Sequence, residues 1–141
     1  MSDEELTELI TKVNEIFYDK LFDDPWLSQI FVDVDQDIIT SQQTDFIVGA
    51  LGGPQKYCGR SPKDAHPHIF IQEDMWDVRE AYMVEALKEA NAPEWISEKW
   101  LKIDNAFKAA ILKGSIDECS GRYKSEEIIN IPNPNSFKKA A

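Results

Sequence analysis

Hydrophobic residues recur every three or four positions along most of the chain, which is the period of an amphipathic helix. The first such run extends from Leu6 to Leu21, and Ser2 and Glu5 before it fit a capping box. Pro25 has no amide proton and restricts the residue before it, so the Asp23-Asp24-Pro25 segment should end this helix. The pattern predicts one long helix at the start of the chain.

The same criterion predicts further helices. We expect them over residues 26–32, 38–51, about 63–66, 74–90 and about 94–113. Gly52-Gly53-Pro54 stops the second of these, and Pro93 is well placed to start the last one. No convincing alternating strand pattern is present, which indicates an all-α protein. After residue 114 the chain turns polar and contains several prolines, so we expect a domain over 1–114 and a C-terminal extension or tail over 115–141.

Composition narrows the class of protein. A chain of 141 residues with 43% hydrophobic residues is typical of one globular domain. No apolar run approaches the length of a membrane span and no signal peptide is recognised, so we expect a cytoplasmic protein. The net charge of −11 opposes binding to nucleic acids and to anionic membranes. Cys58 and Cys119 are far apart in the sequence and are expected to be free thiols.

Few residues can carry chemistry. The chain has two histidines, His66 and His68. Gln43 shares a helix face with Ile39 and Phe46, where an unpaired buried amide would cost about 1–3 kcal/mol. Gln43 therefore either reaches water at the edge of that face or meets a ligand that accepts a hydrogen bond.

An ordered set of motifs resembles a truncated haemoglobin, closest to the group I pattern. The set is Phe17-Tyr18-Asp19, Asp24-Pro25, Gln43-Thr44-Asp45-Phe46, Ala50-Leu51-Gly52-Gly53-Pro54, Tyr57, Gly59 and Ala65-His66. It covers roughly residues 5–112. The resemblance implies a two-over-two helical globin fold around haem b, and the binding of dioxygen, nitric oxide or another small ligand at ferrous iron.

The resemblance also implies roles for single residues. His66 matches the proximal iron ligand; His68 is the rival, and the spacing from Gly52 favours His66. Tyr18 and Gln43 match the distal hydrogen-bond donors. Phe46 matches the aromatic residue that packs on the porphyrin, and Ile39 stands where a distal histidine would be.

Arg79 departs from the family pattern, because it falls on the centre of an apolar stripe where an apolar residue or tryptophan is usual. A buried guanidinium needs a partner. Arg79 either interacts with the bound ligand or a haem propionate, or it extends to solvent on the side of Glu80 or pairs with a carboxylate.

A second group of polar residues precedes His66. Lys56, Tyr57, Arg60 and Lys63 lie close together in the sequence there. They either meet the haem propionates through charge-assisted bonds or form a solvated loop.

Three classes of function follow from the resemblance. The first is reversible binding or transport of dioxygen. The second is catalysis, as a nitric oxide dioxygenase or a peroxidase-like enzyme, which would need a separate reductase. The third is a sensor or interaction module in which the extension contacts a partner.

Overall fold

The computed structural model describes residues 1–134, and this part of the chain is all-helical, as the sequence predicted. Its elements are α1 (Asp3–Asp23), η1 (Leu27–Phe31), α2 (Gln36–Ala50), α3 (Pro62–Ala65), α4 (Glu73–Glu89), α5 (Glu94–Ile111) and η2 (Ile116–Glu118), where η denotes a 3-10 helix. Every predicted helix is present with its ends shifted by at most a few residues. The last seven residues of the predicted extension, 135–141, lie outside the described residues.

Local hydrogen bonds explain where α1 begins and ends. The Glu5 amide donates to the Ser2 hydroxyl at 3.1 Å and the Ser2 amide donates to the Glu5 carboxylate at 3.2 Å, so the predicted capping box is formed. At the other end, one carboxylate oxygen of Asp24 accepts from the amides of Trp26 at 2.8 Å and Leu27 at 2.7 Å. Asp24 therefore ends α1 and starts η1.

The ends of α2 and α4 depend on special backbone positions. Asp35 caps α2 by accepting from the Ile38 amide at 3.0 Å. Gly52 follows α2 with a φ of 94°, a conformation that side chains rarely adopt. Asn91 has a φ of 54° between α4 and α5, which agrees with the predicted break before Pro93.

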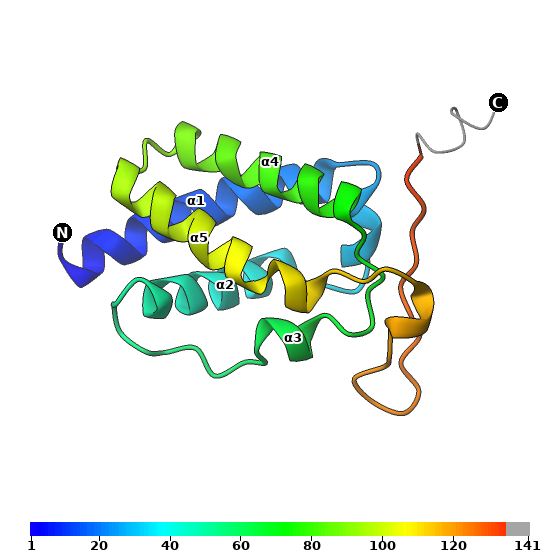
Figure 1. The fold of residues 1–141 in the computed structure, drawn as a ribbon. Helices are drawn as coiled ribbons and strands as arrows, with labels where there is room; N and C mark the ends of the chain where they lie inside the picture. The colour runs from blue at the N-terminus through cyan, green and yellow to red at the C-terminus, as the bar shows by residue number, and fades with distance from the viewer. Residues whose placement is uncertain (135–141) are drawn as a thin grey trace.

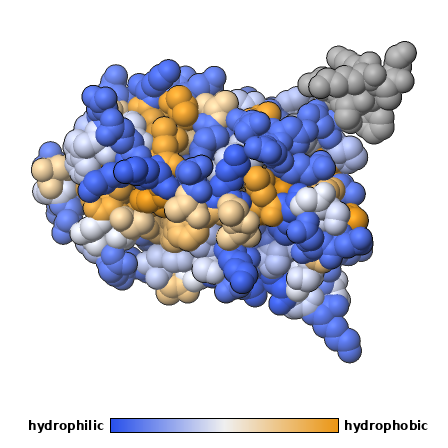
Figure 2. Space-filling model, in the orientation of Figure 1, coloured by the Kyte–Doolittle hydropathy of each residue, from blue (hydrophilic) through white to orange (hydrophobic). Residues whose placement is uncertain are grey.

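Helix α1 is the centre of the packing. It contacts both α2 and α4, while α3 contacts α5 (Figure 1). The interior is built from fully buried apolar side chains, among them Ile10, Phe17, Ile47, Met83 and Trp100. On the face shown in Figure 2, hydrophobic side chains gather in a band across the middle and hydrophilic ones cover most of the rest, as expected for an acidic chain.

The extension folds back onto the helices. Figure 1 shows it running along the end of the molecule where η1 lies. Ile69 and Ile129 form an isolated parallel bridge, and the Trp26 indole donates to the Ile131 carbonyl at 2.9 Å. Up to residue 134, the extension consists of η2 followed by irregular backbone, packed on the helical body.

Within the described part of the chain, no helix combines the length and the apolar character that crossing a membrane requires.

Candidate functional site

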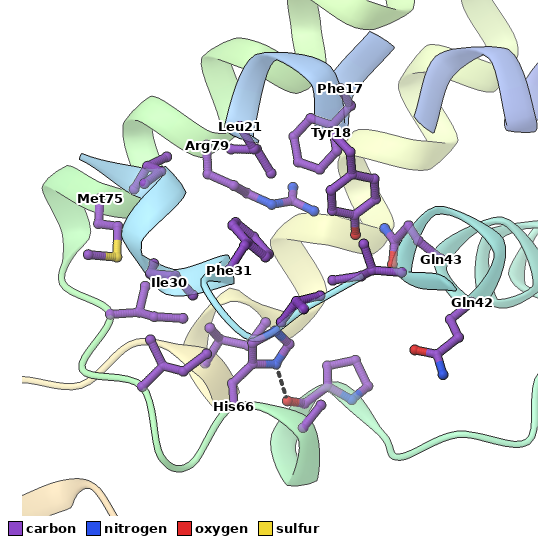
Figure 3. A pocket seen from close by; sticks show the side chains of 18 of the residues that line it. Phe17, Tyr18, Leu21, Ile30, Phe31, Gln42, Gln43, His66, Met75 and Arg79 are labelled. Atoms are coloured by element: carbon purple, nitrogen blue, oxygen red, sulfur yellow. Dashed lines mark hydrogen bonds between the residues drawn. The ribbon is translucent and has the colours of Figure 1, made fainter. Parts of the chain in front are cut away.

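A cavity of about 580 Å³ lies between α1, α2, α4, α5 and the segment around α3. Its lining includes every residue predicted on the distal side and at the iron: Tyr18, Ile39, Gln43, Phe46, His66 and Arg79. Figure 3 shows Tyr18 and His66 reaching into this space from different sides. Residues far apart in the sequence are thereby brought to one site.

His66 is held by the turn on which it sits. Ser61 caps α3 and Pro62 begins it, and His66 follows directly after its last residue. The His66 Nδ1 atom lies 2.6 Å from the Pro62 carbonyl oxygen. Because a carbonyl can only accept, Nδ1 carries the proton and Nε2 is left with its lone pair. Burial lowers the pKa of His66 to about 4, so the ring is neutral near pH 7.

His68 also lines the cavity but has different surroundings. It is buried, and its Nδ1 lies 3.9 Å from a carboxylate oxygen of Glu126, too far for a hydrogen bond. Burial lowers its pKa. Of the two histidines, only His66 has, within residues 1–134, the ring-to-carbonyl bond that usually orients a metal-binding imidazole.

Tyr18 offers a hydroxyl group to the cavity. Its ring is buried and packs edge-on against Phe17 and Phe31, with centroids 5.0 and 6.2 Å apart. Burial raises the pKa of Tyr18, so the hydroxyl keeps its proton. No hydrogen bond to the Tyr18 hydroxyl or the Gln43 side-chain amide is found within residues 1–134, and both groups are available to a ligand.

Arg79 lies in the cavity wall between two aromatic rings. Its guanidinium carbon is 4.8 Å from the Phe17 centroid and 5.2 Å from the Trp76 centroid. Its Nη1 donates to Asp104 and to Glu80, at 2.8 Å in each case. Burial raises the pKa of the Glu80 carboxyl to about 8, against the opposing effect of Arg79.

Of the two alternatives for Arg79, the carboxylate pair is therefore present. The side chain is nevertheless part of the cavity lining, and its guanidinium extends towards Tyr18 in Figure 3. Pairing with Asp104 and facing the ligand space are compatible.

The predicted polar group before His66 lies outside the lining. Lys56, Arg60 and Lys63 are exposed and none of them lines the cavity. Tyr57 packs edge-on against Phe46 at 5.2 Å, and its hydroxyl donates to the Arg60 carbonyl. Tyr57 thus supports a wall residue, and direct contact of this group with a cofactor stays a prediction.

Sequence reasoning missed several residues of the site, chiefly Asp104, Phe107 and Arg122. Asp104 had a detectable signal: it shares a helix face with the buried Trp100 and Ile111, where an acidic residue is unusual. Arg122 had none, because only the folded extension brings it to the cavity.

Comparison with known proteins agrees with this geometry. The sequence model of the family described as "Bacterial-like globin" matches residues 5–113. A group 1 truncated haemoglobin of Tetrahymena pyriformis is 31% identical over 88 residues, which is 62% of this chain and 73% of that protein. The chain belongs to the group 1 truncated haemoglobins.

Solved structures of truncated haemoglobins have the same fold. The Fe(III) form of the Tetrahymena pyriformis protein superimposes with a TM-score of 0.69 at 25% identity, covering 79% of this chain and 98% of that one. A truncated haemoglobin of Chlamydomonas reinhardtii gives a TM-score of 0.62 at 30% identity, covering 77% and 90%. The predicted two-over-two globin fold is confirmed.

As a truncated haemoglobin, the chain has haem with its iron as cofactor, and its activity is haem-based binding of small gaseous ligands such as dioxygen. The residues present fit that group. The cavity is within the size range of cofactor sites and has aromatic and aliphatic walls. His66 presents an unprotonated nitrogen, and the Tyr18 hydroxyl has no protein partner within residues 1–134.

Proposed function

We propose that this chain binds dioxygen reversibly, with His66 holding the haem iron and with Tyr18 and Gln43 as donors to the ligand. Haem, when bound, supplies a ferrous iron at which a diatomic molecule can coordinate. Nitric oxide is a second ligand of the same size.

The observation that carries the proposal is the bond between His66 and the Pro62 carbonyl. It fixes which nitrogen is protonated and limits rotation of the ring, as the outer partner of a metal-bound imidazole usually does. His66 lines the cavity together with Tyr18, which comes from another element. One imidazole and one hydroxyl donor thus face a common space.

The distal residues determine which ligand is retained. The Tyr18 hydroxyl is a hydrogen-bond donor inside a mostly apolar wall, where an unmet donor is costly. A ligand that accepts a hydrogen bond removes that cost. Dioxygen draws electron density onto its oxygen atoms more than carbon monoxide does, so Tyr18 and Gln43 favour dioxygen.

Absorption spectra of the purified protein test the assignment of the iron ligand. We expect a Soret band in the parent protein, retention of the haem in His68→Ala, and its loss or a clear spectral change in His66→Ala. External imidazole should restore the parent spectrum of His66→Gly and leave His68→Gly unchanged. Haem loss confined to the His68 variants would refute the role given to His66.

The purified protein can also be used to test for catalytic activity. A nitric oxide dioxygenase or peroxidase-like activity, a reductase partner, a role in oxygen transport and a cytoplasmic location remain predictions. A ferrous dioxygen complex that persists for many minutes favours binding or transport, whereas rapid oxidation with turnover favours catalysis.

A further inference from the structure

Two arginines are the cationic residues in the cavity lining among residues 1–134. Arg79 comes from α4 and uses one nitrogen for Asp104 and Glu80. Arg122 comes from the extension, beyond residue 113 where the family match ends. The other charged lining residues, histidines aside, are Asp33, Asp35 and Asp104, and their carboxylates would repel an anion. An anionic group entering the cavity therefore meets few cations.

The Arg122 guanidinium is held in place within the extension. Its Nε lies 3.0 and 3.1 Å from the two carboxylate oxygens of Glu126, and its Nη2 lies 2.6 Å from one of them. The Arg122 amide also donates to Glu126 at 2.7 Å. Nη1 has no hydrogen bond within the described residues, and the side chain is 29% exposed. One end of the guanidinium is thus fixed and the other is free to bind an anion.

Hydrogen bonds attach the extension to the segment that follows His66. The Ser120 amide donates to the Pro67 carbonyl, the Ile129 amide to the His68 carbonyl, and the Phe70 amide to the Ile129 carbonyl, each at 2.8 Å. These bonds hold the residues around Arg122 beside the segment that directly follows His66, the proposed iron ligand.

Lys113, two residues before the extension begins, is bound to the same segment. Its ammonium group donates to the carbonyls of His66 and Ile69, at 2.8 Å in each case. The extension is therefore attached both before and after Arg122, and Arg122 has a defined position relative to His66.

Haem carries two propionate carboxylates, which need polar or cationic partners. The cations before His66 lie outside the lining, whereas Arg122 is part of it with its side chain 29% exposed. We propose that Arg122 binds a haem propionate, so that the extension is a functional part of the haem site. This inference rests on the haem site proposed above and adds a residue from outside the matched family region.

The rate of haem loss from the full-length protein tests the inference. Haem would be transferred to an excess of a haem-free scavenger globin and followed by absorbance, for the parent, Arg122→Gln, Arg122→Lys and the control Lys124→Gln. Lys124 is an exposed cation of the same extension and lies outside the lining. We expect haem loss about three- to tenfold faster for Arg122→Gln, as for one charge-assisted hydrogen bond at a partly exposed site. Haem loss from Arg122→Lys should lie between that of the parent and that of Arg122→Gln, and Lys124→Gln should match the parent.

Haem dimethyl ester, in which both propionates are uncharged, provides the decisive comparison. If Arg122 binds a propionate, the parent and Arg122→Gln lose the ester at the same rate. An equal acceleration with haem and with the ester would show that Arg122 acts only through the fold and would overturn the inference, as would equal haem loss from Arg122→Gln and the parent. A parent protein that binds no haem would instead refute the proposed function.

Discussion

The pair of Arg79 and Asp104 gives a stability prediction that can be worked from the structure. Asp104 is 5% exposed, and the carboxylate oxygen that faces Arg79 lies 2.8 Å from Nη1. Arg79→Met keeps a long apolar chain between Phe17 and Trp76 but removes the cation that pairs with the Asp104 carboxylate. Removing one partner of a buried ion pair costs about 3–5 kcal/mol. For a domain of this size, that corresponds to a Tm lower by roughly 10–20 °C.

The double variant Arg79→Met/Asp104→Leu supplies the control. It also removes the Asp104 carboxylate, and replacing both partners of a buried ion pair by apolar residues is often neutral or stabilising. We expect it to recover most of the lost Tm, measured by far-UV circular dichroism on the haem-loaded proteins at one concentration. A fall of less than about 1 kcal/mol in the single variant, or a double variant as unstable as the single one, would refute the reasoning.

Two further predictions concern a ligand donor and a titrating group. Tyr18→Phe should release dioxygen several-fold to about tenfold faster in stopped-flow measurements, because one hydrogen bond worth about 0.5–1.5 kcal/mol is lost; an equal change for carbon monoxide would contradict a donor role. Burial raises the pKa of Glu80 to about 8 in the folded protein, whereas the unfolded chain releases this proton near pH 4.5. The free energy of unfolding should therefore fall as the pH rises from about 4.5 to 8. In Glu80→Gln this pH dependence, at most about 1.4 kcal/mol per pH unit, should be absent, as measured by urea unfolding at several pH values. Parallel pH profiles for the parent and the variant would contradict the role given to Glu80.

Much of the fold could be predicted because local signals agree along the chain. The capping box of Ser2 and Glu5 and the break at Asn91 each act over a few residues, and both are found in the structure. The observed helix ends differ from the predicted ones where a capping contact, and not the apolar pattern, decides the end. Helix α2, for example, begins at Gln36 because Asp35 caps it, although the apolar pattern starts only at Ile38.

The site was less predictable where contacts join distant segments. The sequence placed Tyr18, Gln43, Phe46 and His66 in one set, and all four line the cavity. The sequence offers the cations of the loop before His66 as candidates for the haem propionates, because they lie close to His66 along the chain. The structure instead places Arg122 in the lining, since hydrogen bonds between the extension and residues 67–70 carry it there.

By itself, the sequence predicted the helices and their order, and its resemblance to the truncated haemoglobins named the residues proposed to bind iron and a gaseous ligand. The helices depend on apolar periodicity and caps, which act locally. Only the tertiary structure decided that Arg79 pairs with Asp104, which lies on the next helix, and that the extension supplies Arg122. The Arg79–Asp104 pair follows from burial, because a charge removed from water takes the nearest partner in space, whatever its distance along the chain. The position of Arg122 follows from the hydrogen bonds that attach the extension to residues 67–70.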